Sequence, residues 1–399
     1  MSKYREYQVL DLPKIHKYIS DRWKEYKIFE ECIESSKEKP IFTFYEGPPS
    51  ANGMPGIHHV IARTIKDLFC RYKTLKGYRV DRKAGWDTHG LPVELGEEKR
   101  LDITKEDIGK KVSIKDYNDA CRQDVMKYKS DWEKLTNDMG YWVDMESPYV
   151  TYENKYIESV WWILSELHKK KLLYKGFTIQ PYSPSAGTAL STHELNQPGC
   201  YRDVTDISAV AMFKIIHDKG SDFIFDNDDE VSFLAWTTTP WTLPSNTALV
   251  VGKKIEYVKI RTFNIYSFEP ITIIMAKDLV HKYFTEKLSL SDFNHGDKDL
   301  PYKIVKEFSG DQLEGIYYEQ LFPYKKPEDG DAFRVIIGDF VTTEDGTGIV
   351  HAAPSFGSDD NLVAKKNGIG SLTLVNEQGR FVDEVVDFAG QYVKDEFYK

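Results

Sequence analysis

Apolar residues recur with a helical period along most of the first half of the chain. The clearest stripe runs from Ile57 to Leu75, and Gly77 is expected to end that helix. The same period predicts further helices over about 12–37, 114–139 and 154–173.

Two extended segments flank the helix of residues 57–75. Residues 40–46 and 78–84 are rich in aromatic or β-branched side chains, and a loop of Gly, Pro, Ser and Asn at 47–55 follows the first of them. A strand, a Gly-rich loop, a helix and a second strand make a βαβ unit of a parallel sheet. The sequence therefore predicts a partial Rossmann-like, nucleotide-binding sheet.

The pattern changes beyond about Pro181. Short runs of alternating or continuous apolar residues dominate, and Gly, Asp and Asn turns separate them. The clearest predicted strands are 208–216, 231–236, 247–251 and 334–337. We expect an α/β protein of two domains: a partial Rossmann-like domain over 1–196 and a β-rich domain over 197–399.

Composition narrows the class of protein. The chain has 399 residues, 41% hydrophobic and 14% aromatic, which suits two globular cores. A net charge of −10 argues against a non-specific nucleic-acid coat protein but is compatible with a specific RNA partner. Four cysteines without a CxxC pair indicate reduced thiols. With no apolar run long enough for a bilayer and a charged start without an apolar signal region, we expect a cytoplasmic protein.

The first candidate site is the segment from Glu46 to His59, which joins the first predicted strand to its helix. Ligands of parallel sheets bind at the carboxyl ends of strands, and a helix N-terminus there attracts anions. His58 and His59 are therefore candidates to contact phosphate oxygens. The alternative is that the two imidazoles cap the helix or pack beneath it.

The second candidate site is the segment from Gly85 to Glu94, directly after the next predicted strand. A carboxylate at the end of a strand, such as Asp87, is well placed to bind an ammonium group. The alternative is that Asp87 caps the following helix, a common use of Asp before Leu-Pro-Val-Glu.

These segments resemble the start of class I isoleucyl-tRNA synthetases. The similarity rests on Gly-Pro-Pro-x-Ala-Asn-Gly with a His motif, and more specifically on Gly-Trp-Asp-x-His-Gly-Leu-Pro-Val-Glu. It continues, in order along nearly the whole chain, through 196–203, 236–246 and 346–360.

The resemblance implies ATP-dependent formation of isoleucyl-adenylate, followed by transfer of the acyl group to tRNA(Ile). By the family pattern, Gly47, Pro48 and Asp87 bind isoleucine, and Asp87 holds its ammonium group. Asn52, His58 and His59 bind ATP, whose phosphates bring Mg²⁺ without a dedicated protein metal site.

The resemblance also implies a hydrolytic editing site in the β-rich domain. Asp360 corresponds to the carboxylate that holds the amino group of a misplaced aminoacyl ester, and His351 to the histidine that shapes its pocket. The hydroxyls that would surround the ester and a water are those of Thr238, Thr239 and Thr242, with Thr237 beside them. Without the resemblance, the Thr run would be interpreted as a β-bulge. Asp359 is expected to be a helix cap or loop residue.

The chain departs from the family pattern in three places. The usual His-x-Gly-His reads Gly56-Ile57-His58-His59, which we interpret as a variant of a working site. Residues 181–188 carry Ser183 and Ala186 where related proteins have zinc-binding thiolates, so no structural zinc is expected. The Lys-Met-Ser-Lys-Ser loop that completes the ATP site is missing, which predicts a fragment. An editing-only deacylase of mischarged tRNA and a non-catalytic tRNA-binding fragment remain as alternatives.

Overall fold

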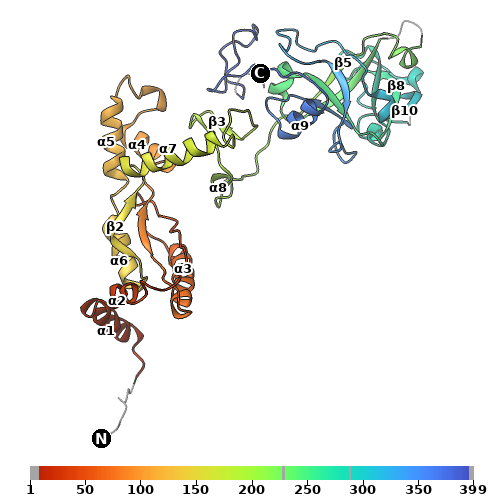
Figure 1. The fold of residues 1–399 in the computed structure, drawn as a ribbon. Helices are drawn as coiled ribbons and strands as arrows, with labels where there is room; N and C mark the ends of the chain where they lie inside the picture. The colour runs from red at the N-terminus through yellow and green to blue at the C-terminus, as the bar shows by residue number, and fades with distance from the viewer. Residues whose placement is uncertain (1–8, 227–229, 287–288, 395–399) are drawn as a thin grey trace. The chain divides into compact units, whose positions relative to one another are not determined.

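The structure, a computed structural model, describes residues 9–226, 230–286 and 289–394. The chain divides into two compact units, 1–175 and 176–399, each described by itself below (Figure 1). The ends of the two expected domains, residues 1–8 and 395–399, lie outside the described residues.

The helices of unit 1 are α1 (Leu12–Glu25), α2 (Ile28–Glu34), α3 (Ile57–Leu75), α4 (Leu91–Leu101), α5 (Ile114–Asp124), α6 (Lys129–Asp138) and α7 (Asn154–Lys169). Its strands are β1 (Lys83–Trp86) and β2 (Asp144–Val150).

Unit 2 contains α8 (Thr192–Leu195) and α9 (Ser358–Lys366). Its strands are β3 (Tyr182–Ser183), β4 (Thr188–Ala189), β5 (Ala209–Lys214), β6 (Val231–Thr237), β7 (Ala248–Val251), β8 (Glu256–Phe263), β9 (Pro270–Ala276), β10 (Lys303–Ser309), β11 (Arg334–Ile337) and β12 (Ile349–Ala352). A 3₁₀ helix over Pro240–Ser245 follows the Thr-rich loop.

The sheet of unit 1 is parallel but small. β1 pairs with β2 in parallel, from Lys83 opposite Asp144 to Trp86 opposite Val150. The predicted strand 40–46 is wrong, because this segment makes one isolated parallel bridge, Ile41 to Arg79, and otherwise has no regular secondary structure. Both that bridge and the parallel pairing of β1 with β2 keep the directions expected of a βαβ unit.

The α3 helix has the predicted bounds, and Gly77 follows it with a φ of 90°, a left-handed conformation that favours glycine. Its apolar stripe is exposed, however. Ile61, Ile65, Leu68, Phe69 and Tyr72 all face solvent, whereas Arg63 and Cys70 are buried. The side of α3 that packs within unit 1 is therefore the side carrying its polar residues.

Two of the long predicted helices are broken. The helix expected over 12–37 is divided at Lys27, which has a left-handed φ of 49°. The helix expected over 114–139 is divided between Asp124 and Lys129, where the backbone N–H of Tyr128 donates to the carbonyl of Ala51. Tertiary hydrogen bonding overrides the local helical preference there.

A mixed sheet forms the core of unit 2, in the strand order β10-β8-β9-β6-β12-β7-β11, with β5 on β6. β6 pairs in parallel with β9 and β12, whereas β12 is antiparallel to β7. Fully buried side chains such as Phe233, Leu249 and Ile273 fill the main core. The parallel pair β6 and β12 brings the carboxyl ends of two strands to one edge of the sheet.

A short hairpin of β3 and β4 contains the segment that lacks the zinc-binding thiolates. The Ser183 hydroxyl accepts a hydrogen bond from the Ala186 backbone N–H at 3.2 Å. Within the described residues, no cluster of three or more potential metal ligands occurs. No helix in the same residues is both long enough and apolar enough to cross a membrane.

Candidate functional site

The Gly- and Pro-rich loop of unit 1 and the start of α3 enclose a cavity of about 400 Å³. Gly47, Pro48 and Asn52 line it from the loop, and His59 and Lys66 line it from the helix. The cavity thus combines backbone amides, a helix N-terminus and basic side chains, which are the groups that bind phosphates.

The adjacent histidines play different structural roles. His59 Nδ1 accepts the backbone N–H of Gly56 at 2.9 Å and so caps α3, as the alternative interpretation proposed. Burial, reinforced by His58 and Arg63, lowers the pKa of His59. Its ring is therefore neutral near pH 7, with the proton on Nε2 and free to donate to an anion.

His58 is exposed and stacks near His59, with ring centroids 3.8 Å apart. A Cβ at Gly56 would lie 2.8 Å from His58 Cε1, so a side chain at position 56 would have to displace that ring. In the Gly-Ile-His-His variant the glycine is thus at position 56, where the ring of His58 leaves no room for a side chain.

A buried carboxylate anchors the loop and was not singled out from the sequence. Glu46, whose side chain is 3% exposed, forms an ion pair with Lys66 and accepts a hydrogen bond from the Tyr141 hydroxyl. Burial and Glu46 raise the pKa of Tyr141, while burial lowers the pKa of Arg63, which lies over the Tyr141 ring. The pairing with Lys66 fixes the loop against α3.

Asp87 lies beside the same loop but does not line the cavity. Its backbone N–H donates to the Pro49 carbonyl at 3.0 Å, and Ser50 and Asp87 form a parallel bridge. The helix-cap alternative is wrong, because Gly90 is the N-cap residue of α4. The Asp87 side chain is therefore not committed to capping that helix.

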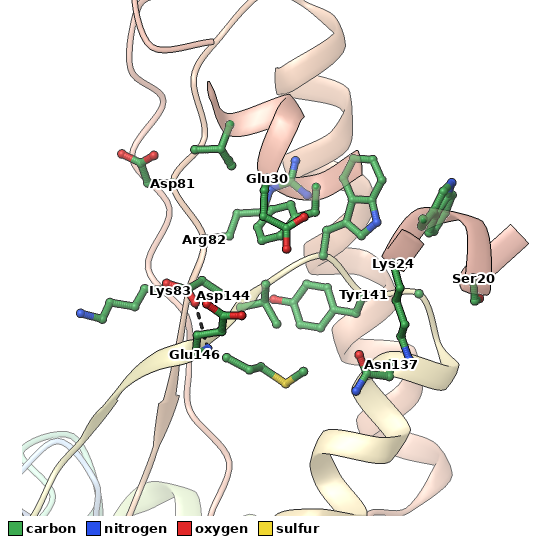
Figure 2. A pocket seen from close by; sticks show the side chains of 17 residues that line it. Ser20, Lys24, Glu30, Asp81, Arg82, Lys83, Asn137, Tyr141, Asp144 and Glu146 are labelled. Carbon is green, nitrogen blue, oxygen red and sulfur yellow. Dashed lines mark hydrogen bonds between the residues drawn. The ribbon is translucent and has the colours of Figure 1, made fainter. Parts of the chain in front are cut away.

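A larger cavity of about 650 Å³ lies elsewhere in unit 1 (Figure 2). Its lining includes Lys83 and Asp144, the first residues of the two parallel strands, and also Tyr141 and Trp142. That is the amino end of the sheet, opposite to the end where Asp87 follows β1. Because ligands of parallel sheets bind at the carboxyl ends, we do not assign the substrates to this cavity.

The editing residues expected from the sequence line a single cavity of about 270 Å³ in unit 2. The Thr-rich loop follows β6 and His351 lies on β12, and these two parallel strands pair at Trp236 and Val350. Their carboxyl ends therefore meet. The cavity is lined by Thr237, Thr238, Thr239, Thr242, His351 and Asp360, together with aromatic and small residues.

The threonines of the loop differ in exposure. Thr238 and Thr239 are exposed, whereas Thr237 and Thr242 are buried. The Thr237 hydroxyl accepts the backbone N–H of Thr239 at 3.1 Å, and the Thr242 hydroxyl donates to the Thr239 carbonyl at 2.7 Å. The two buried hydroxyls thus shape the loop. The Thr239 hydroxyl also lies 3.5 Å from that of Thr237 and 3.4 Å from that of Thr242, and both Thr238 and Thr239 face the solvent side of the loop.

His351 and Asp360 line the same cavity, and His351 Nε2 lies 3.0 Å from the Thr242 hydroxyl. Burial lowers the pKa of His351 to about 4, so the ring is neutral at physiological pH. Burial raises the pKa of Asp360, although the hydrogen bond from the Ala353 N–H opposes that shift. A Cβ at Gly357 would lie 2.8 Å from Asp360 Cγ, so the glycine gives this carboxyl room to turn toward β12.

Asp359 is exposed and shares the first turn of α9 with Asp360. It is not the N-cap residue of that helix, which is Gly357.

Sequence reasoning missed two buried residues behind the cavity, Asn246 and Tyr318. Asn246 is 3% exposed and Tyr318 is 1% exposed, and the Tyr318 hydroxyl donates to Asn246 Oδ1 at 2.7 Å. Asn246 stands between two other polar residues, Ser245 and Thr247, so the local sequence carries no signal that its amide is buried and must be hydrogen-bonded.

The chain matches a known protein family over most of its length. Residues 18–328 match the tRNA synthetases class I (I, L, M and V), and the chain belongs to that family.

The relatives refine this assignment. The chain is 59% identical, over 99% of its length, to a protein of Cytophaga hutchinsonii named isoleucine–tRNA ligase. Proteins with the same name from Porphyromonas gingivalis and Clostridium tetani are 59% and 45% identical, over 98% and 96% of the chain. The chain spans only 36%, 34% and 34% of the lengths of these three relatives.

Solved structures give distant likenesses. One is described as GlLeuRS-CP1, at 18% identity and a TM-score of 0.33, covering 47% of this chain and 92% of that one. Another is the P. knowlesi cytosolic leucyl-tRNA synthetase editing domain, at 14% identity and a TM-score of 0.30, covering 39% and 60%.

Proposed function

We propose that this chain is part of an isoleucine–tRNA ligase and carries two of its sites, one for isoleucine activation and one for editing. The high identity to proteins of that name over nearly the whole chain supports the proposal. Unit 1, continued to about residue 196 within unit 2, would contribute part of a Rossmann-like catalytic domain. The rest of unit 2, residues 197–399, would form an inserted editing domain. Such a protein works in the cytoplasm.

In the activation site, the isoleucine carboxylate attacks the α-phosphate of ATP, and pyrophosphate leaves. Gly47, Pro48 and Asp87 bind isoleucine, with Asp87 on its ammonium group. Asn52, His58 and His59 bind ATP, and a neutral His59 can donate its Nε2–H to a phosphate oxygen. Mg²⁺ enters with the ATP phosphates and offsets their charge.

The exposed apolar stripe of α3 supports the proposal that the working catalytic domain is larger than unit 1. Ile61, Leu68 and Phe69 are each more than half exposed, at 59%, 64% and 60%. Contiguous apolar surface of this kind is usually covered by another element. The relatives are about three times as long as the chain, so residues outside it would supply that cover.

The observation that best supports an editing function is that the Thr-rich loop, His351 and Asp360 line one cavity. We propose that the Asp360 carboxylate holds the ammonium group of an aminoacyl ester on tRNA(Ile). The hydroxyls of Thr238 and Thr239 then bind the ester and an attacking water. The ester is already activated, so positioning contributes more to its hydrolysis than a strong base does.

A second site answers a specific chemical problem. Isoleucine exceeds valine by one methylene group. The binding free energies of the two amino acids in one pocket therefore differ by only about 1–3 kcal/mol, a value for which this enzyme family is the usual example. A hydrolytic site that accepts the smaller valyl ester corrects the remaining errors.

An editing-only deacylase is the second candidate function. It is favoured by the location of every editing residue within unit 2, whereas the ATP site of unit 1 lies beside exposed apolar surface.

The test of the main proposal uses the full-length protein. We expect isoleucine-dependent exchange of pyrophosphate into ATP, and aminoacylation of tRNA(Ile) with isoleucine. Absence of the exchange reaction, together with retained deacylation of valyl-tRNA(Ile), would select the editing-only alternative.

A further inference from the structure

A chain of hydrogen bonds connects the core of unit 2 to the Thr-rich loop. The Tyr318 hydroxyl donates to Asn246 Oδ1 at 2.7 Å, and Asn246 Nδ2 lies 3.4 Å from His351 Nδ1. His351 Nε2 in turn lies 3.0 Å from Thr242 Oγ1. All four side chains are buried, so each polar atom depends on its partners in this chain.

The orientation of the Asn246 amide follows from its neighbours. Its nitrogen donates to the carbonyls of Ala248 at 2.9 Å and Ala352 at 3.4 Å, and a carbonyl can only accept. A flipped amide would turn its oxygen toward both carbonyls. The Tyr318 hydroxyl, which can donate, lies on the side of the amide oxygen.

The amide nitrogen also faces His351 Nδ1, and because an amide nitrogen cannot accept a hydrogen bond, that ring atom must carry a lone pair and not a proton. Because burial lowers the pKa of His351 to about 4, the neutral ring has one proton, which is then on Nε2. This proton points at Thr242 Oγ1, whose own proton is donated to the Thr239 carbonyl. The two protons of the Asn246 amide are then shared among three acceptors, namely His351 Nδ1 and the carbonyls of Ala248 and Ala352.

We infer that Asn246 is a positioning residue that fixes His351 as the Nε2–H tautomer. His351 consequently acts on the Thr-rich loop as a hydrogen-bond donor and not as the base of hydrolysis. The inference rests on the proposed editing function.

During hydrolysis, water adds to the ester carbon, the bond from that carbon to the ribose oxygen breaks, and the ribose oxygen gains a proton. The proton lost by the water does not pass to His351. Nε2 already carries a proton, and the Nδ1 lone pair is directed at the Asn246 amide.

Nitrogen NMR of the chain with ¹⁵N-labelled histidine tests the inference directly, because the two tautomers give different long-range proton–nitrogen patterns. The His351 signals are assigned by their loss in His351→Gln. We expect a protonated Nε2 and an unprotonated Nδ1 at neutral pH. An Nδ1–H tautomer or an imidazolium would overturn the inference. The measurement is made on the wild-type chain, and the variant His351→Gln serves only to assign its signals.

Two variants sharpen the test. Asn246→Asp replaces the donor facing Nδ1 with an acceptor, so the His351 proton is expected to move to Nδ1. Retention of Nε2–H as the sole protonated nitrogen in that variant would contradict the inference. Tyr318→Phe is the matched control, since Ala248 and Ala352 still orient the amide. We expect the wild-type tautomer there, and a changed tautomer would contradict the role given to the two carbonyls.

This readout is independent of activity. A chain with the expected tautomer that fails to release valine from valyl-tRNA(Ile) contradicts the proposed function and leaves the tautomer assignment in place. A chain that releases valine but carries Nδ1–H contradicts the tautomer assignment alone.

Discussion

Asp360 Oδ2 accepts a hydrogen bond at 3.0 Å from the backbone N–H of Ala353, and this bond joins the first turn of α9 to the residue after β12. It holds the carboxyl at the wall of the cavity that we propose for editing. The same burial that positions the group makes its ionised form costly.

We expect Asp360→Asn to lose activity without losing stability at neutral pH. Burial raises the pKa of Asp360 above its unfolded value, so the group stabilises the fold at low pH, and this contribution is lost as pH rises through the folded pKa. Asn avoids that cost and can still accept the Ala353 N–H. Urea unfolding at pH 7 is the measurement, with the exposed Asp359→Asn as control. A markedly less stable Asp360→Asn would contradict this account.

His351 predicts the opposite pH dependence. Because its pKa falls from 6.5 to about 4, its contribution to stability is present above pH 6.5 and is lost as pH falls toward 4. The contribution is at most about 3 kcal/mol. Between pH 7 and pH 4.5, the wild-type urea midpoint should therefore fall more steeply than that of His351→Gln. Equal slopes would show that His351 is not buried as a neutral ring.

Asp87→Ala should impair isoleucine use far more than ATP use in the full-length protein. Loss of a charge-assisted hydrogen bond to the ammonium group costs about 1.5–3 kcal/mol, or roughly a 10- to 100-fold loss in kcat/KM for isoleucine. Pyrophosphate exchange at varied isoleucine and ATP measures both. Since Gly90 caps α4, the helical circular dichroism should stay unchanged. An unaltered isoleucine kcat and KM would remove the assigned role.

The 399-residue chain alone should not make isoleucyl-adenylate at a useful rate. Activation depends on groups held on both sides of the reacting phosphate, and in unit 1 the apolar stripe of α3, the helix that lines the proposed ATP site, is uncovered. Isoleucine-dependent pyrophosphate exchange by the chain is the assay. Turnover of about 1–10³ s⁻¹, ordinary for enzymes, would refute this prediction.

The sequence predicted helices and strands correctly where an apolar pattern is long or where a residue such as glycine marks its end. α3 has the bounds expected from its apolar period and from Gly77, and β11 has the bounds of its apolar run. Residues 40–46 look like a strand in the sequence, yet Ile41 and Tyr45 are exposed and only one bridge forms. Propensity alone does not provide a pairing partner.

The sequence named the residues of the candidate sites, but it did not show which of their side chains lie in contact. The motifs named His351 and Thr242, whereas their contact across the sheet depends on the parallel pairing of β6 with β12, which no local pattern encodes. The capping role of His59 was left open beside a phosphate role. The structure shows the cap, through Nδ1, and the phosphate contact by Nε2 stays a prediction. Asn246 was missed because its function depends on the atoms around it.

The most direct test of the account is release of labelled valine from valyl-tRNA(Ile) by this chain and three variants. We predict hydrolysis by the wild type. Because binding of the ammonium group orients the substrate, the hydrolysis rate of Asp360→Ala should be lower by about 10²-fold or more. Thr239→Ala should lose less, because neighbouring hydroxyls and water can substitute, and the exposed Asp359→Ala should lose least. Undiminished activity in Asp360→Ala, or equal losses at Asp359 and Asp360, would contradict the central claim.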